Sequence, residues 1–288
     1  MDLSHIIRPS FHVRPEIRPE NIVSILKALE STEDIDSIAD VSTLKTRKTQ
    51  VEAISELRKL KLVNSRDFCI TERAKSILEL ANRRPHLLCE AIHATYLQMG
   101  VGSSDGAQVG SSWAYQRLCA VIWQDREGAL DKSGAIGQVV GDAAEAFGID
   151  EQIISFSPKS VKGIINWIVG LEPAALVYKQ SKICITLRHV CPPEAVFWAV
   201  DSLVRTDPVR SPLGSRIILT EDRINTICQN LLVHPDSLGR VLTQAKNHSD
   251  YSQGGFFDTG FAGGVGRWVL LAEHVSPFIS ILYGKAKA

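Results

Sequence analysis

One pattern of apolar and turn residues occurs twice in this 288-residue chain. In residues 51–57 and again in 161–167, apolar side chains stand at positions i, i+3 and i+6, the spacing of one helix face. Each predicted helix is followed by a short strand, turn residues and a return strand that ends in Cys-Ile-Thr, at 69–71 and at 184–186. A chain that repeats helix, strand, turn and strand in this register is expected to fold into small modules.

The residues around the first copy complete a recognisable order of elements. Asn21–Leu29 has the pattern of an amphipathic helix, and Ile35–Val41 that of a shorter one. Leu62–Val63 and Phe68–Ile70 are expected to form a two-stranded wing, and Thr71 to cap the next helix. Three helices, a wing and a further helix resemble a winged helix-turn-helix domain.

The second copy is expected to repeat this arrangement. Its earlier helices are predicted at 113–124 and 135–147, and its third helix begins after Ser157 as N-cap with proline in the first turn. The residues 177–178 and 183–185 are expected to be its strands.

A looser third copy is expected near the C-terminus. Two helices are predicted, from Thr220 to Leu232 and from His234 to Lys246. The glycine-rich stretch 251–266 is expected to be a long loop and 268–271 a returning strand, which together would form an oversized wing.

The expected fold is therefore mainly α with small β-wings (α+β), built of tandem winged helix-turn-helix units. The expected segments are an extended N-terminal arm, a first winged-helix unit with a trailing helix, a Gly/Ser-rich linker, a second winged-helix unit and a third winged-like unit. Their boundaries are 1–18, 19–99, 100–112, 113–190 and 191–288.

Composition limits the functions open to such a chain. Its 32 Lys and Arg balance 32 Asp and Glu, which excludes a protein that coats nucleic acid over its whole surface but permits a local patch. No apolar run is long enough to span a bilayer, and the first residues do not read as a signal peptide. Six scattered cysteines without a Cys-x-x-Cys pair read as reduced thiols of a cytoplasmic protein.

Basic residues on the expected third helices and wings indicate contacts with nucleic acid. Residues 41–75 form a basic island, and in a winged helix the third helix enters the major groove. Glu52 and Glu56 on the first such helix favour the alternative of a solvated, salt-bridged face, whereas the second helix carries no acid. The expected nucleic-acid-binding residues are Lys45, Arg47, Lys48, Thr49, Lys59, Arg66, Lys159, Lys162, Asn166, Lys182, Arg240 and Lys246.

Two further segments have alternative interpretations. The arm holds three Arg-Pro pairs, and its extended chain could lie in a minor groove. Alternatively, Phe11 and Val13 pack it on the first domain as an edge strand; both could hold, since alternate side chains of a strand point to opposite faces. The glycine-rich loop from Gly254 to Gly266 is expected to dock on a partner rather than on its own core. Its partner-binding residues are predicted to be Phe256, Phe257 and Phe261.

The chain lacks the common motifs of enzymes. It has neither a phosphate-binding Gly-x-x-x-x-Gly-Lys-Ser/Thr loop nor a Gly-x-Ser-x-Gly elbow, so we expect no catalytic residue, cofactor or metal.

The start Phe11-His12-Val13-Arg14, the winged unit and the Trp-containing helical region resemble winged-helix proteins encoded in bacterial DNA-modification and phage-defence clusters. This resemblance implies an accessory or regulatory DNA-binding role, with duplex DNA and other protein subunits as partners and no membrane. The alternative is a structural protein–protein interaction subunit of a multiprotein nucleic-acid complex.

Overall fold

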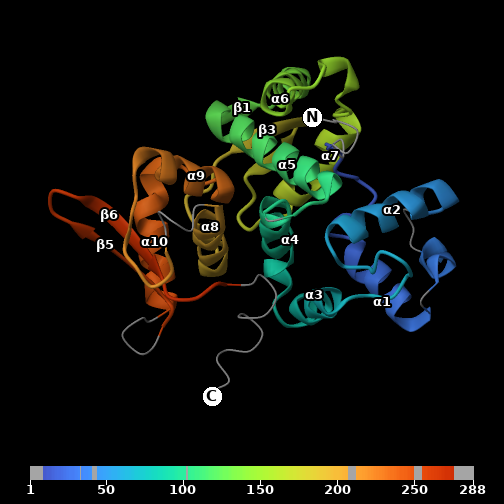
Figure 1. The fold of residues 1–288 in the computed structure, drawn as a ribbon, viewed down its shortest axis with the longest axis horizontal. Helices are drawn as coiled ribbons and strands as arrows, with labels where there is room; N and C mark the ends of the chain where they lie inside the picture. The colour runs from blue at the N-terminus through green and yellow to red at the C-terminus, as the bar shows by residue number, and fades with distance from the viewer. Residues whose placement is uncertain are drawn as a thin grey trace, which may run out of the picture. The chain divides into compact units, whose positions relative to one another are not determined.

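The computed structural model describes residues 9–32, 34–40, 44–101, 103–206, 212–249 and 255–275. They are mainly helical with two small antiparallel sheets, which confirms the α+β class (Figure 1). The chain divides into an N-terminal body, Met1–Leu118 with Leu130–Gly170, and a C-terminal body, Cys119–Ala129 with Leu171–Ala288. All six cysteines are free thiols.

The N-terminal body is helical. Its elements are α1 (Ile22–Thr32), η2 (Ile35–Asp40), α2 (Arg47–Lys59), α3 (Glu72–Arg83), η3 (Pro85–Leu87), α4 (Leu88–Gln98), the start of α5 (Gly106–Asp125), α6 (Lys132–Phe147), η4 (Glu151–Ile153) and α7 (Pro158–Val169). The segment expected as a linker thus contains the first turns of α5. Thr71 caps α3 by accepting a hydrogen bond from the backbone N–H of Ala74, as predicted.

The wing predicted in the first segment is reduced to one bridge. Val63 pairs with Ile70, but no strands extend from them. Backbone hydrogen bonds from Asn64 to Cys69 and from Thr71 to Leu62 accompany this bridge, at 3.1 and 3.0 Å. The guanidinium of Arg58 donates to the carbonyl oxygens of Asn64 and Asp67 at 3.0 Å each, and so satisfies acceptors of the turn.

The N-terminal arm is part of the core of this body. Phe11, Val13 and Ile17 are buried, and the arm residues around them form no strand. A side chain at Gly163 of α7 would place its Cβ 2.4 Å from the carbonyl oxygen of Val13, so the backbones touch there only because this residue is glycine. The described part of the arm is packed, as one alternative predicted, but not as an edge strand of the first predicted unit: Phe11 contacts Trp113 and Phe147, and Val13 lies against Gly163. Arg8 lies outside the described residues.

The C-terminal body contains both sheets. Its elements, after the end of α5, are β1 (Glu127–Ala129), β2 (Leu176–Lys179), β3 (Lys182–Thr186), α8 (Pro193–Thr206), β4 (Ile217–Ile218), α9 (Glu221–Leu231), η5 (Pro235–Ser237), α10 (Leu238–Ser249), β5 (Phe257–Ala262) and β6 (Gly266–Leu271).

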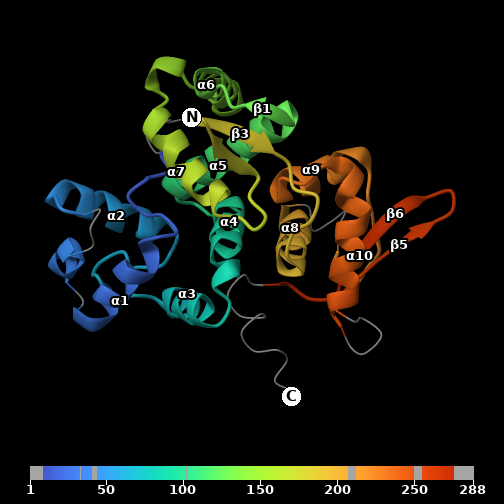
Figure 2. The ribbon, with the colours of Figure 1, turned by 180° about the vertical axis from the view of Figure 1, so that it is seen from behind.

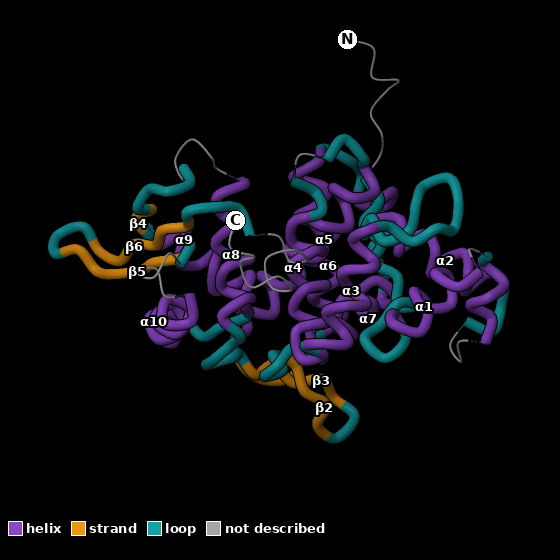
Figure 3. Tube along the Cα trace, turned by 90° about the horizontal axis from the view of Figure 1, so that it is seen from below, coloured by secondary structure: helices purple, strands orange, loops and turns teal. Residues whose placement is uncertain are grey.

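The two sheets share one topology. Their orders are β1-β3-β2 and β4-β6-β5, so each hairpin is flanked on its second strand by a short strand that comes earlier in the chain. Figure 3 shows this order for β4, β6 and β5. The element order helix, strand, helix, helix, hairpin occurs twice, from α5 to β3 and from α8 to β6. The short strands β1 and β4 were not predicted because so few residues carry no readable alternation.

The glycine-rich stretch is a hairpin and not the predicted loop. β5 pairs with β6 from Phe257 opposite Leu271 to Ala262 opposite Gly266; Gly254 lies outside the described residues. Trp268 lies across Gly260, where a Cβ would come within 2.6 Å of its ring, so the aromatic ring replaces the packing that glycine lacks. Phe257 is fully buried against Phe197, which makes its prediction as a partner-binding residue wrong.

We expect a matched pair of glycine substitutions to separate close packing from helix propensity. Gly163→Ala should lower the stability of the N-terminal body by about 1–3 kcal/mol, because its Cβ would overlap the arm. Gly137→Ala in α6 meets nothing within 4 Å and should raise stability by about 0.5–1 kcal/mol. Urea denaturation followed by circular dichroism measures both; equal shifts of the two variants would contradict the packing of the arm.

Candidate nucleic-acid interface

A polar stripe covers the exposed face of α10. Arg240, Thr243, Gln244 and Asn247 are all exposed and lie at i, i+3, i+4 and i+7. The opposite face is buried through Leu238, Val241, Leu242 and Ala245. The helix sequence contains no Asp or Glu.

These four residue types are those that read base edges in a major groove. Arginine binds guanine through two hydrogen bonds, glutamine and asparagine bind adenine in the same way, and the threonine methyl contacts thymine. Arg240 is held in place because it donates to the carbonyl oxygen of His189 at 2.8 Å. The sequence predicted that Arg240 and Thr243 face outward, and both are exposed. The exposed glutamine and asparagine were missed, although their spacing from Arg240 was readable.

Lys246 has a different role from the one predicted. Its Nζ lies 2.8 Å from a carboxylate oxygen of Asp258 and donates to the carbonyl oxygen of Thr259 at 3.3 Å. Since both partners belong to β5, Lys246 attaches the β5–β6 hairpin to α10. Figure 2 shows this hairpin beside α10. At the other end of the helix, Gly239 leaves space for the guanidinium of Arg267 from β6. Asp236, in the turn before α10, is the exposed acid nearest to the stripe in sequence.

A second basic feature of this body is the tip of the β2–β3 hairpin. Lys179 and Lys182 are directly opposite each other, joined by Gln180 and Ser181, both with positive φ. Like charges at opposed positions repel, and within the described part of the chain neither lysine forms an ion pair. Tyr178, which precedes them, is 62% exposed. An anion such as a phosphate would relieve the repulsion.

In the N-terminal body, α2 presents part of the basic island. Lys45, Arg47 and Lys48 are exposed, and Arg47 forms a 2.5 Å ion pair with Asp36. Arg66 is exposed in the turn after α2. Thr49 is half-buried and shares a capping box with Thr46 at the helix start, so its hydroxyl is already engaged. Of these residues, the three cations around the helix start and Arg66 are accessible to a ligand.

The outer face of α2 borders a groove of about 700 Å³. Val51 lines it and is 52% exposed, although the helical spacing predicted that it would be buried. Ile35, Phe68 and Ala107 add apolar surface from other segments.

Lys59 is buried, which contradicts its expected exposure on a binding face. Its Nζ donates to the carbonyl oxygen of His12 at 2.7 Å and lies 3.3 Å from a carboxylate oxygen of Glu56. Glu56 is itself fully buried and accepts a hydrogen bond from the hydroxyl of Tyr96 at 2.8 Å. This pair belongs to the interior because the arm covers that side of α2.

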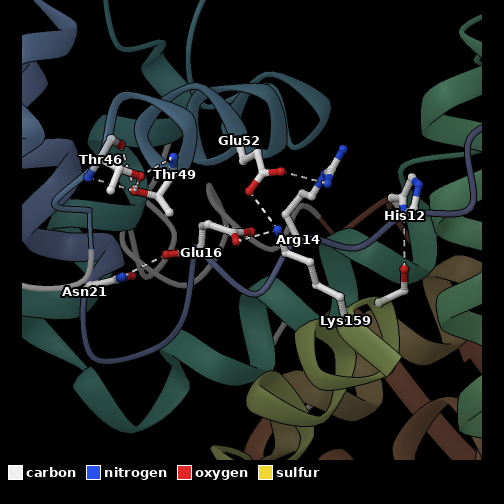
Figure 4. Close-up of polar contacts among 9 residues, drawn as sticks. His12, Arg14, Glu16, Asn21, Thr46, Thr49, Glu52 and Lys159 are labelled. Carbon is white, nitrogen blue, oxygen red and sulfur yellow. Dashed lines mark hydrogen bonds and ion pairs between the residues drawn. The ribbon is translucent and has the colours of Figure 1, made fainter. Parts of the chain in front are cut away.

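The surface expected on α7 is also largely absent. Most of the helix is buried, including Trp167. Lys159 forms ion pairs with Glu16 at 2.9 Å and Glu52 at 2.7 Å, so its expected freedom from acids is wrong (Figure 4). Asn166 is half-buried with its Nδ2 enclosed. Lys159 and Lys162 are both exposed, but the ammonium group of Lys159 is held by the two carboxylates.

The same ion-pair cluster holds Glu52, one of the two glutamates that argued against a DNA-binding face on α2. Glu52 is bound by Lys159 and, at 3.3 Å, by Arg14, so it lies toward the arm rather than among the exposed cations (Figure 4). The hydrogen bond from Lys159 lowers the pKa of the Glu52 carboxyl against the opposing effect of burial. Burial lowers the pKa of His12, and the nearby Arg14, Lys59 and Lys159 lower it further.

The remaining aromatic residues divide between core and surface. Phe256 is half-buried and packs edge-on against Phe197, with ring centroids 4.8 Å apart. Phe261 is 73% exposed near the tip of the β5–β6 hairpin. Of the three predicted partner-binding residues, only Phe261 has its ring mainly in solvent.

Comparison of the chain with protein-family models, curated sequences and solved structures finds no match. Among the residues that the structure describes, no helix has both the length and the apolar character needed to cross a bilayer.

Charge reversal should distinguish the two lysines of α7. Lys159→Glu would place a third carboxylate beside Glu16 and Glu52, and we expect it to destabilise the N-terminal body by about 1–2 kcal/mol. Lys162→Glu is exposed and should change stability by less than about 0.5 kcal/mol. Chemical denaturation of both variants tests this, and equal effects would remove the structural role of Lys159.

The same cluster should make the fold sensitive to acid. Both Glu52 and His12 have a lowered pKa in the folded state, so the stability each contributes is present above its unfolded pKa and is lost as the pH falls. The loss should begin below about pH 6.5 for His12 and below about 4.5 for Glu52. Denaturation midpoints between pH 7 and pH 3.5 measure this, with His12→Asn expected to flatten the upper part of the curve.

Proposed function

We propose that this protein binds duplex DNA without catalysing a reaction, and that α10 enters the major groove. The observation that carries this proposal is the exposed stripe of Arg240, Thr243, Gln244 and Asn247 on a helix without acidic residues. A solvated surface helix commonly mixes both charge signs, whereas this face combines one cation with three neutral hydrogen-bonding or methyl-bearing groups.

The order of elements around α10 supports the same proposal. A helix, a short strand, two helices and a hairpin, with the short strand beside the second hairpin strand, is the arrangement of a winged helix. In that arrangement the last helix before the hairpin is the one that lies in the groove. We propose that the segment from α8 to β6 is such a domain. We propose that the segment from α5 to β3 is a second, divided copy, whose helices α6 and α7 belong to the N-terminal body and whose sheet belongs to the C-terminal body.

The two helices that precede the hairpins would then have different roles. α10 is exposed and suited to bases, whereas α7 is enclosed by the arm and the other helices of its body. For the second domain we therefore propose that only its hairpin contributes, through phosphate contacts of Lys179 and Lys182. The exposed cations of α2 would provide a separate phosphate contact from the N-terminal body.

A second candidate function is a structural role in a protein complex. The observation that favours it is the groove beside α2, where Val51 and Phe68 give an apolar lining. An accessory role in a bacterial modification or defence system is a hypothesis that depends on the sequence resemblance alone.

Measurements of duplex DNA binding should distinguish residues that contact phosphates from residues that contact bases. A site is first selected from a random duplex pool, and affinity is then measured by fluorescence anisotropy at several salt concentrations. Lys182→Gln should reduce the slope of log affinity against log salt by about 0.9, since one phosphate contact is lost. Gln244→Ala should leave the slope unchanged but reduce discrimination between the selected site and random duplex by about 1–3 kcal/mol.

Lys132→Gln, at the exposed start of α6, is the matched control and should alter neither quantity. Absence of duplex binding, or binding that ignores salt, would contradict the proposed function. Binding that is lost on substituting the cations of α2 but not those of the C-terminal body would move the interface to the N-terminal body.

A further inference from the structure

The tip of the β5–β6 hairpin presents two apolar side chains to solvent. Phe261 is 73% exposed and Val265 is 57% exposed. Phe261 is the most exposed of the large apolar residues in the part of the chain that the structure describes. Fully burying a phenylalanine stabilises a structure or a complex by roughly 1.5–3 kcal/mol. Burial of Phe261 against a ligand would therefore add binding free energy of this order.

The hairpin holds this tip in a defined position. Its ladder is continuous from Phe257 opposite Leu271 to Ala262 opposite Gly266. Trp268 covers Gly260, and the guanidinium of Arg216 lies over the Trp268 ring, 4.5 Å from its centroid. A rigid ladder loses little conformational entropy when its tip binds a ligand.

The chemistry around Phe261 suits a polyanion. Arg267 lies directly opposite it in the ladder, and the sequence from 259 to 272 contains no acidic residue. Gly264 and Gly266 have φ of +78° and +101°, which glycine adopts most readily. Gly263 has no such requirement and no atom near its Cβ position, so its missing side chain leaves the backbone open to close approach by another molecule.

The tip also lies toward the end of α10 that would meet the bases. The root of the hairpin is bound to Lys246 near the end of the helix, and Arg267, nearer the tip, lies against Gly239 at the helix start. Figures 1 and 2 both show β5 and β6 beside α10, with the tip projecting away from it. The first turns of a recognition helix are those that contact base edges, so DNA on the stripe would run past this tip.

We infer that Phe261 enters the minor groove of the duplex bound by α10, wedges between two base pairs and bends the DNA. This inference rests on the proposed function and adds a deformation of the duplex to it. Apolar side chains inserted at a minor groove unstack one base step, and an adjacent arginine is attracted by the strong negative potential of a narrow groove. The exposed ring of Phe261 matches the first requirement. Arg267 is its partner in the ladder and supplies the positive charge, with its guanidinium against Gly239 at the start of α10.

The wedge is tested on the selected duplex with two optical probes. 2-Aminopurine placed at successive positions beyond the α10 contact reports unstacking as a rise in fluorescence, and a dye at each end reports bending by energy transfer. The wild-type protein should give a fluorescence rise at one step and a higher transfer efficiency. Phe261→Ala should abolish both and weaken affinity roughly tenfold to a hundredfold.

Ile153→Ala is the matched control, because Ile153 is 54% exposed in η4 and its truncation should leave both signals unchanged. A charge pair tests the open position beside the wedge. Gly263→Lys should strengthen binding and Gly263→Glu should weaken it, whereas Gly137→Glu, equally uncrowded on α6, should have little effect.

The outcomes separate the wedge from the proposed function. If the wild-type protein binds duplex DNA while Phe261→Ala retains the fluorescence rise and the bend, the wedge is wrong and the proposed function stands. If the wild-type protein does not bind duplex DNA, the proposed function itself fails. If Phe261→Ala releases a protein partner and leaves DNA affinity unchanged, the tip is a protein-docking surface and this inference is overturned.

Discussion

The buried guanidinium of Arg188 holds together the parts of the C-terminal body on which any ligand contact there depends. Arg188 is 2% exposed, and its Nε and Nη2 donate to the carbonyl oxygen of Leu231 at 2.8 and 2.5 Å, at the end of α9. Its own backbone pairs with the next turn, donating to Leu232 at 2.9 Å and accepting from His234 at 2.8 Å. The last carbonyl groups of a helix have no partner within it, so this side chain satisfies a group that burial would otherwise leave unpaired.

This contact links two chain segments that are distant in sequence. Arg188 follows β3 directly, and the turn that it binds leads into η5 and α10. Trp123 adds a hydrogen bond from its ring N–H to the carbonyl oxygen of Val233, at 3.0 Å. The start of the polar stripe is therefore set by hydrogen bonds from segments that carry no stripe residue themselves, and Arg240 completes the connection through the carbonyl of His189.

The helices α7 and α10 hold the same place in a repeated order of elements but differ in how much of their surface is exposed. Both helices precede a hairpin, and both have basic residues in their sequences. The arm crosses α7 at Gly163, and the carboxylate of Glu16 in the arm forms an ion pair with Lys159. Most of α7 is therefore buried within its own body and leaves little surface for a ligand. α10 buries one face, and its exposed face retains the polar groups that a groove requires.

Local patterns alone predicted the class of the fold, the helices with clear amphipathic spacing, the cap at Thr71 and the β2–β3 hairpin. They did so because helix periodicity and caps depend on residues within a few positions of each other. The binding residues were predicted less well, because whether a lysine is free depends on acids distant in the chain: Lys59 and Lys159 meet His12, Glu16 and Glu52 only after folding. The part of the glycine-rich stretch from Phe257 to Ala262 is a strand, and Trp268 packs on Gly260 across its ladder, a contact that no local signal carries. The sequence by itself thus determined which segments become helices, while the tertiary structure decided which of their charged faces remain in solvent, since ion pairs and burial join residues that the chain order keeps apart.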